Sequence, residues 1–278
     1  MNVSTRNPSR RTAIMQNMIN YADELIKKLS SFACVDAIAL GGSRAGDAFD
    51  EKSDYDVYVY CKTRIPDGER VKILEEYCNR IEAGNSFWEY EDNCVLKDGL
   101  GIDLIYRDLD GFAADVSDVV DKFHARNGYT TCMWHNLITC RILYDKEGKL
   151  AELQKKYSRP FPEELKRNII ERNLKLLRFG IPAYEEQILK AVSRGDEVSI
   201  NHRVTEFLAS YFDIIFAVNG LTHPGEKRLS ELCEKQCKLL PANFRGNIHK
   251  LFSDMFKKPE SLSDDLNTIT NELLKIIN

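Results

Sequence analysis

The residues from Ala37 to Tyr60, AIALGGSRAGDAFDEKSDYDVYVY, decide the fold of this chain. The apolar run Val35–Leu40 ends at Gly41-Gly42-Ser43, which is the pattern of a buried strand that closes in a tight turn with exposed backbone. Glycine lets the main chain approach a ligand closely, and the N–H groups of such a turn, together with the Ser43 hydroxyl, could hold a phosphate. The turn therefore predicts an anion-binding site at the end of a strand.

A second strand is predicted from Ser53 to Tyr60, and it carries two aspartates two positions apart. Residues i and i+2 of a strand share a face, so Asp54 and Asp56 are expected to project together. Two carboxylates so close repel each other unless a cation lies between them. Mg²⁺ is usually held by a few carboxylates plus substrate phosphates. The pair therefore predicts a magnesium site beside the turn.

This order of motifs resembles the nucleotidyltransferases of the DNA polymerase beta superfamily, in which a Gly-Gly-Ser turn is followed by Asp-x-Asp on the next strand. The third carboxylate of that family lies on a later, neighbouring strand, and Asp103 within Gly101–Tyr106 has the matching place. The resemblance implies that the catalytic and metal-binding residues are Asp54, Asp56 and Asp103. It leaves open whether Asp103 is a metal ligand or the base.

The resemblance also implies a nucleotide site and its cofactors. Mg²⁺ is the expected metal, and ATP or another NTP is the expected co-substrate. The antibiotic adenylyltransferases that this chain resembles have a C-terminal helical bundle that closes over the nucleotide and contacts the drug. A basic residue of that bundle can touch the triphosphate, and Lys227 is the candidate here. The residues expected to bind nucleotide are Gly42, Ser43, Arg44 and Lys227.

The predicted fold class is α+β, with a mixed sheet flanked by helices followed by an all-α bundle. Strand patterning ceases at Pro160-Phe161-Pro162, and long helical segments take over. We therefore expect a nucleotidyltransferase catalytic domain over residues 1–150 and a helical acceptor-binding domain over residues 151–278. The helices expected in the second part are Glu163–Arg178, Ile181–Arg194, Glu197–Asn219, Glu226–Cys237 and Ser263–Ile277.

The first 150 residues carry further expected elements. Helical periodicity predicts helices over residues 12–30, 69–81 and 111–126, and a short one between Arg44 and Lys52. Residues 86–90, 94–97, 101–106 and 142–145 are strand candidates. Glu89 and Glu91 are expected on one face of a strand beside Asp103, where either could assist as a base.

The composition limits the binding partners and the compartment that we expect for this chain. A formal net charge of −4 over 278 residues disfavours a general nucleic-acid binder, which normally carries a basic stripe. The eight cysteines are scattered without a Cys-x-x-Cys pair, which indicates reduced thiols and a cytoplasmic protein. No apolar run approaches membrane-spanning length, so no membrane partner is expected, while a homodimer is left open.

The leading hypothesis is therefore an enzyme that transfers AMP, or another NMP, from an NTP to a hydroxyl of a small molecule. An aminoglycoside or lincosamide antibiotic is the acceptor that the resemblance suggests, which would make the chain a resistance protein. One alternative is a nucleotidyltransferase acting on a protein or tRNA. Another is a catalytically silent nucleotide-binding protein on the same fold.

Overall fold

The computed structural model describes residues 20–45 and 53–277, which pack into two compact units. The first, here called the sheet unit, comprises the described residues up to Gly111 together with Thr139–Glu152. The second, the helical unit, comprises Phe112–Ile138 and the residues from Leu153 onward. Packing thus groups residues 112–138 with the helices, whereas sequence periodicity assigned them to the first domain because it cannot tell which core a helix covers. The domain boundary near residue 150 stays a prediction.

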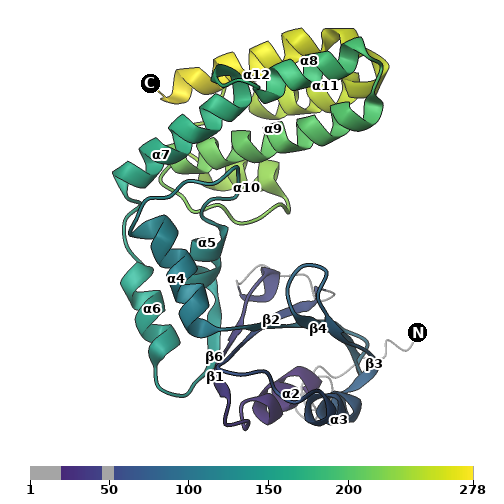
Figure 1. Ribbon diagram of the computed structural model, residues 1–278, viewed down its shortest axis with the longest axis vertical. Helices are drawn as coiled ribbons and strands as arrows, with labels where there is room; N and C mark the ends of the chain where they lie inside the picture. Colours follow the sequence, from purple (N-terminus) through teal and green to yellow (C-terminus); the bar gives the residue numbers. More distant parts are fainter. Residues whose placement is uncertain (1–19, 46–52, 278) are drawn as a thin grey trace, which may run out of the picture. The chain divides into compact units, whose positions relative to one another are not determined.

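The sheet unit is built on a mixed six-stranded sheet in the order β3-β4-β5-β2-β1-β6 (Figure 1). Only β2 and β5 run parallel to each other among these neighbours. The α+β class expected from the sequence is confirmed, because this sheet is followed along the chain by a series of helices. The strands are β1 (Val35–Leu40), β2 (Tyr55–Cys61), β3 (Cys78–Asn85), β4 (Glu91–Leu96), β5 (Gly101–Arg107) and β6 (Arg141–Asp145).

Alternation along the strands sends neighbouring side chains to opposite faces of the sheet. Val57 and Leu104 belong to a buried core with the helices α2 (Tyr21–Leu29) and α3 (Asp67–Tyr77), which lie on one side of the sheet in Figure 1. Their neighbours along the strands, including Asp56 and Asp103, must therefore project from the opposite face. We call this opposite face the aspartate face.

Helix α2 shows how local chemistry sets a boundary. The Asn20 side chain accepts a hydrogen bond from the Asp23 backbone N–H, and Lys27 and Lys28 occupy the last turn. Such a cap and such charges stabilise helix ends. The prediction of a helix over residues 12–30 is met from Tyr21 onward, and residues 12–19 lie outside the described residues.

The region between α3 and β4 differs from the prediction. Residues 78–81 are not helical but begin β3, and residues 86–90 form no strand but the loop of the β3–β4 hairpin. β3 is an edge strand with mostly exposed side chains, so the alternation that normally reveals a strand is missing. Phe87 and Trp88 favour strands by propensity, yet here they are 81% and 89% exposed at the hairpin loop.

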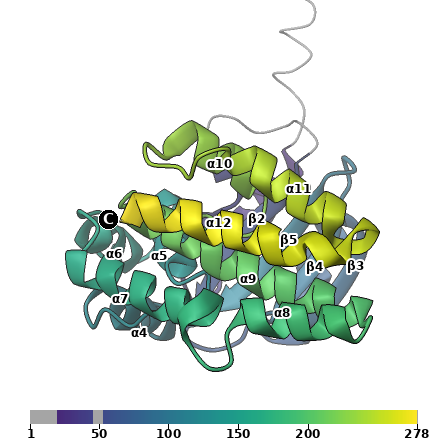
Figure 2. The same cartoon turned by 90° about the horizontal axis from the view of Figure 1, so that it is seen from above.

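Helix α9 (Glu197–Val218) is the centre of the helical unit. Five of its neighbours pack against it: α7 (Glu163–Leu174), α8 (Tyr184–Ser193), α10 (Leu229–Gln236), α11 (Phe244–Lys257) and α12 (Leu262–Ile277). Figure 2 shows α8, α9, α12 and α11 running alongside one another. Phe207, Tyr211 and Ile215 of α9 are buried in the shared core. The apolar face expected for an interior bundle helix is therefore observed.

The predicted helices of this unit are found with shifted ends, and one was omitted. Residues 175–179 form a π-helical turn after α7, and the helix expected from Glu226 begins at Leu229. α11 was not among the predicted helices, although Phe244, Ile248, Leu251 and Met255 repeat at helical spacing and are all buried. The remaining helices, which connect sheet and bundle along the chain, are α4 (Leu109–Val120), α5 (Cys132–Thr139) and α6 (Lys149–Tyr157).

A buried carboxylate fixes the loop at residues 128–131 of the helical unit. Asp213 of α9 accepts hydrogen bonds from the Thr130 backbone N–H (3.0 Å), the Thr130 hydroxyl (2.6 Å) and the Asn173 amide (3.1 Å). Burial raises the pKa of Asp213 to about 6, although these hydrogen bonds oppose the rise. Asn173 in turn accepts from the Gly128 N–H at 3.1 Å. Two helices therefore hold the loop on both sides of Tyr129.

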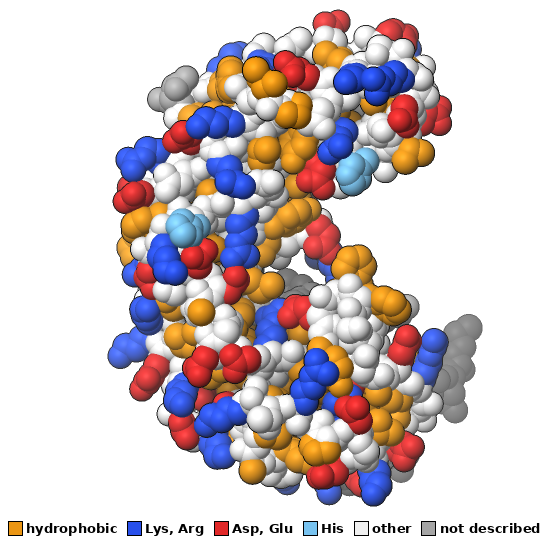
Figure 3. Space-filling view, viewed as in Figure 1, with side chains coloured by type: hydrophobic (Ala, Val, Ile, Leu, Met, Phe, Trp, Pro, Cys, Tyr) orange, Lys and Arg blue, Asp and Glu red, His pale blue; other side chains and the backbone are white. Residues whose placement is uncertain are grey.

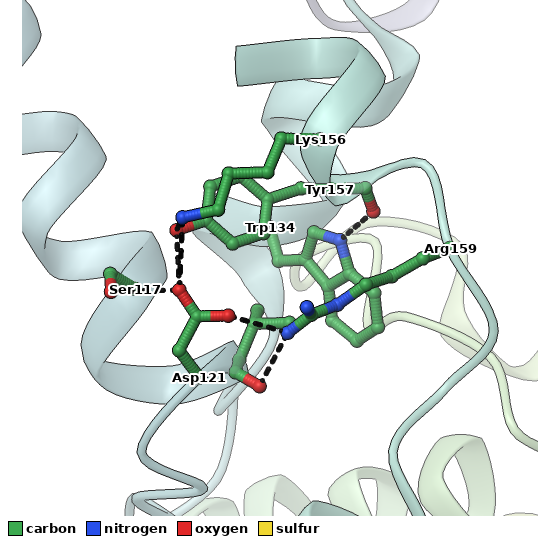
Figure 4. Close-up of polar contacts among 7 residues, drawn as sticks. Ser117, Asp121, Trp134, Lys156, Tyr157 and Arg159 are labelled. Carbon is green, nitrogen blue, oxygen red and sulfur yellow. Dashed lines mark hydrogen bonds and ion pairs between the residues drawn. The ribbon is translucent and has the colours of Figure 1, made fainter.

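A second carboxylate joins α4 to the end of α6 (Figure 4). Asp121 follows α4 directly and lies at the centre of a set of donors. Burial alone would raise its pKa, but the hydrogen bonds outweigh burial and hold the pKa well below its usual range. The Trp134 indole lies beside this cluster and donates to the Tyr157 carbonyl at 2.9 Å. The donors to Asp121 are Ser117, Lys156, Tyr157 and Arg159.

The surface carries charges of both signs. Figure 3 shows acidic and basic side chains interspersed over the visible face, in keeping with 39 Lys and Arg against 43 Asp and Glu in the sequence. Within the described residues, none of the helices combines the length and the apolar character needed to span a lipid bilayer.

Candidate active site

The turn after β1 lies against the aspartate face of β2. The Gly41 N–H donates to the Asp56 carbonyl at 2.8 Å, which ties the turn to the strand. Gly42 has a φ of +59°, and a Cβ at this position would lie 1.8 Å from Oδ2 of Asp56. Only glycine can adopt this backbone at such close range without moving the carboxylate. The structure thus brings the turn directly against the Asp56 carboxylate.

Two of the three predicted carboxylates are direct neighbours. Asp56 of β2 and Asp103 of β5 are register partners in the parallel pair, so they stand side by side on one face, about 4.8 Å apart between strands. Asp54 directly precedes β2 and is exposed. A Cβ placed on Gly101 would lie only 2.4 Å from Oδ1 of Asp54. The missing side chain of Gly101 thus leaves room for the Asp54 carboxylate.

Asparagine side chains extend this polar face toward the sheet edge. Asn93 of β4 is the register partner of Asp103 and donates to its Oδ1 at 2.8 Å, while Asn85 of β3 donates to Asn93 at 2.8 Å. Asn93 therefore orients the Asp103 carboxylate through its Oδ1. Sequence reasoning missed both asparagines. Their signal was their position on strands next to Asp103, but those strands were themselves misplaced.

Two other residues of the sheet unit, Ser43 and Arg44, were predicted to bind nucleotide. Ser43 is exposed and begins a short 3₁₀ turn, Ser43–Ala45. Arg44 donates from Nε to the Ser53 carbonyl at 2.5 Å, and its guanidinium lies 4.1 Å from the centre of the Tyr55 ring. Arg44 is thus fixed next to Asp54. Residues 46–52, where the rest of the predicted short helix would fall, lie outside the described residues.

Glu89 and Glu91 do not share a strand face, contrary to the expectation, because only Glu91 lies in a strand. Glu89 lies before β4 and forms a two-pronged ion pair with Arg107 at 2.7 and 2.5 Å. Glu91 begins β4 and is buried. Burial raises the pKa of Glu91, the hydrogen bond from Asn93 opposes the rise, and the negative charges of Asp103 and Glu89 add to it. The raised pKa makes Glu91 a stronger proton acceptor than an ordinary glutamate.

Lys227, the remaining predicted residue, belongs to the helical unit. It is exposed and lies two residues before α10. Its neighbour Arg228 is engaged with Glu231 through two hydrogen bonds, at 2.9 and 2.5 Å. The role of Lys227 in nucleotide binding stays a prediction.

The donor set suits a magnesium ion that is shared with a substrate. Over residues 20–45 and 53–277, no three His, Cys, Asp or Glu side chains converge into a cage for a metal. Mg²⁺ rarely uses such a cage, since it is usually held by one or two carboxylates, waters and substrate phosphates. Asp54, Asp56 and Asp103 offer carboxylate oxygens beside a turn that can take the phosphates. These residues fit Mg²⁺ that arrives together with a nucleotide.

The space at Gly101 leads to a specific prediction. Gly101→Ala places a methyl group on the Asp54 carboxylate, which must rotate away. Because only an exposed side chain has to move, stability should change little. Affinity for Mg²⁺ with a non-hydrolysable ATP analogue should fall about 10- to 100-fold, the range for losing the support of a metal ligand. Calorimetric titration measures it, with Gly68→Ala as control because a Cβ there meets nothing within 4 Å. Unchanged affinity in Gly101→Ala would place Asp54 outside the metal site.

Comparison with known proteins gives a family match and several similar solved structures. A family described as a domain of unknown function, DUF4037, matches residues 129–228. No curated protein matches the chain.

Among solved structures, the chain is similar to a nucleotidyltransferase-like protein from Exiguobacterium sibiricum 255-15, at 13% identity and a TM-score of 0.43. That match covers 92% of this chain and 73% of the other. The chain is also similar to an aminoglycoside 6-adenyltransferase from Bacillus subtilis, at 9% identity and a TM-score of 0.29, over 92% of this chain and 87% of the other.

Proposed function

We propose that the chain is a Mg²⁺-dependent nucleotidyltransferase that moves a nucleoside monophosphate from an NTP, with ATP as first candidate, to a hydroxyl of a small molecule. The observation that carries the proposal is the pairing of Asp56 with Asp103 next to the Gly42 backbone. It brings two carboxylates and an exposed glycine turn together on one face of the sheet. A protein that only bound nucleotide would not need the second carboxylate.

In this reaction the acceptor oxygen forms a bond to the α-phosphorus, and the bond from that phosphorus to the pyrophosphate oxygen breaks. The proton of the acceptor hydroxyl passes to a carboxylate or to water, and pyrophosphate leaves. The Gly42 and Ser43 backbone and the Ser43 hydroxyl hold the phosphates. When bound on the aspartates, Mg²⁺ supplies positive charge to the transferring phosphoryl group and the leaving pyrophosphate.

Asp103 is the residue closest to the acceptor in this arrangement. The strand order puts the phosphate-binding turn on the β1 side of Asp56 and Asp103 on the far side, next to β4. An acceptor hydroxyl that attacks in line with the departing pyrophosphate would therefore approach from the β4 side. Asp103 can then take the proton or hold a second metal ion, and Asn93 keeps its carboxylate in place.

The acceptor class follows from charge. A net charge of −4 disfavours a long polyanionic acceptor such as tRNA, and a small polar or cationic molecule is compatible with an acidic site. Aminoglycosides and lincosamides are accordingly the first acceptors to test. The full chain is incubated with Mg²⁺, each labelled NTP and a panel of these compounds, and pyrophosphate is measured. Release that needs both Mg²⁺ and an acceptor supports the proposal, whereas nucleotide binding without release under every condition favours a silent nucleotide-binding protein.

Asp103→Asn separates the two roles of the third carboxylate. We expect nearly normal Mg²⁺·ATP binding, because Asp54 and Asp56 remain, but transfer slowed by about 10²- to 10⁴-fold, the typical effect of losing a general base. If Asp103 is only the base, the defect shrinks at higher pH as the acceptor ionises unaided. If it binds metal, more Mg²⁺ is required at every pH. Turnover across a pH and Mg²⁺ series measures this, and normal turnover throughout would move the base assignment to Glu91.

A further inference from the structure

The helical unit contains an open pocket of about 420 Å³, a volume within the range of small-molecule sites. Its walls come from α9, the start of α10 and α11, and from the loop that carries Tyr129. Phe252 of α11 is 52% exposed and Tyr129 is 36% exposed, so large apolar surfaces face solvent here. None of the residues assigned above to nucleotide, metal or proton transfer lines this pocket.

Tyr129 is held in a costly conformation at the pocket wall. Its φ is +53°, a left-handed backbone that a bulky residue rarely adopts. The buried hydrogen bonds from Gly128 to Asn173 and from Thr130 to Asp213 fix the backbone on both sides of it. The ring also packs against His223, with ring centres 4.9 Å apart. Conformations of this kind persist where the surrounding structure imposes them, and they cluster at binding sites.

Two acidic and two basic side chains line the pocket, and both basic ones are already paired. Arg228 is paired with Glu231, and Arg245 is paired with Glu234 at 3.1 Å. Glu226 takes part in no ion pair within the described part of the chain, although the exposed Lys227 follows it directly. Glu226 and Tyr129 line the same pocket, and the negative charge of Glu226 adds to the rise that burial causes in the pKa of Tyr129.

We propose that this pocket binds a small organic cation, an ammonium group on an apolar body that carries a ring. Glu226 provides the opposite charge, and the Tyr129 ring contacts the ammonium group through its face. Phe252 and Leu208 cover the apolar body of the ligand. The inference stands on the helical unit alone and does not rest on the proposed reaction.

The test uses phenethylammonium as the probe and 2-phenylethanol as its neutral match, with the full chain in calorimetric titration. A probe of this size should bind with a dissociation constant of about 1 mM. Glu226→Gln should weaken binding of the ammonium probe about three- to fivefold, as expected for an exposed ion pair. Tyr129→Leu should weaken it about threefold through loss of the ring face. Both substitutions should change the affinity for 2-phenylethanol, which binds weakly, by a smaller factor than the affinity for the ammonium probe.

A control variant, a folding check and a salt series accompany the titration. Glu260→Gln removes one exposed carboxylate outside the pocket and should leave binding unchanged, and thermal unfolding confirms that each variant is folded. Added salt should weaken the ammonium probe and spare the neutral one, because salt screens exposed charges. Three results would overturn the proposal: equal binding of both probes, ammonium binding that is insensitive to Glu226→Gln and Tyr129→Leu, or no binding at about 10 mM probe, roughly ten times the expected dissociation constant.

Discussion

Replacing Asp56 with asparagine should reduce nucleotidyl transfer by at least about 100-fold while the fold persists. Asparagine nearly matches aspartate in shape but loses the charge, and removal of one preorganised electrostatic group typically costs about 10²- to 10³-fold in rate. That loss corresponds to about 3 kcal/mol of transition-state stabilisation. Asp56 should show the largest effect in the site. Its carboxylate lies against the turn and beside Asp103, and its backbone carbonyl accepts the hydrogen bond from Gly41.

The measurement is pyrophosphate release with saturating nucleotide and acceptor. Glu75→Gln serves as the matched control, because it removes one exposed carboxylate from α3, on the opposite side of the sheet. It should retain the wild-type rate. If Asp56→Asn and Asp54→Asn both kept a substantial part of that rate, these carboxylates would not be the catalytic pair, and the proposed function would lose its basis.

The largest effect on stability is expected at a buried ion pair behind the aspartate face. Arg70 of α3 lies 2.7 Å from Asp92 of β4, and both side chains are almost fully buried. Tyr106 and the Gly84 N–H complete the hydrogen bonds of Asp92, at 2.9 and 2.8 Å. Asp92→Asn removes the buried counter-ion of Arg70 and leaves only the exposed Asp67 carboxylate, at 3.0 Å, beside its charge. Breaking a buried pair from one side typically costs about 3–5 kcal/mol, a large share of the roughly 5–15 kcal/mol that stabilises a domain.

Native-state hydrogen exchange of the β4 and β5 amides measures this effect, because it reports on the sheet unit separately. Glu147→Gln is the control in the same unit, since it removes one partner of an exposed pair with Lys149 at 3.0 Å and should leave protection unchanged. Wild-type protection in Asp92→Asn would mean that the pair contributes nothing net. A substitution of both partners by apolar residues should be milder than Asp92→Asn, because it leaves no buried charge.

The strands nearest the site could be predicted from sequence because buried strands have a short, clear pattern. Val35–Leu40 and Gly101–Tyr106 were found in nearly the observed bounds, and the parallel register then brings Asp56 beside Asp103. β3 could not be found, since an exposed edge strand loses its alternation. The asparagine relay from Asn85 through Asn93 was missed with it, because side-chain order across a sheet depends on strand neighbours far apart in the chain.

Other features depend on contacts that a linear pattern does not contain. The room that Gly101 leaves for Asp54 exists only after β2 and β5 have paired. The left-handed Tyr129 is imposed by Asn173 and Asp213, about 45 and 85 residues further along the chain. Helix α11 is a different case, since its apolar residues repeat at helical spacing and were simply overlooked.

The placement of the two tryptophans determines what intrinsic fluorescence can report. Trp88 at the β3–β4 hairpin is 89% exposed in the native state, so its indole is already in water and its emission should change little on unfolding. Trp134 in the helical unit is 2% exposed and packs near Phe161, so its emission should shift strongly to the red when that unit opens. A fluorescence melt of this chain would therefore follow the helices, and the sheet that carries the aspartates could lose its structure with hardly any change in signal.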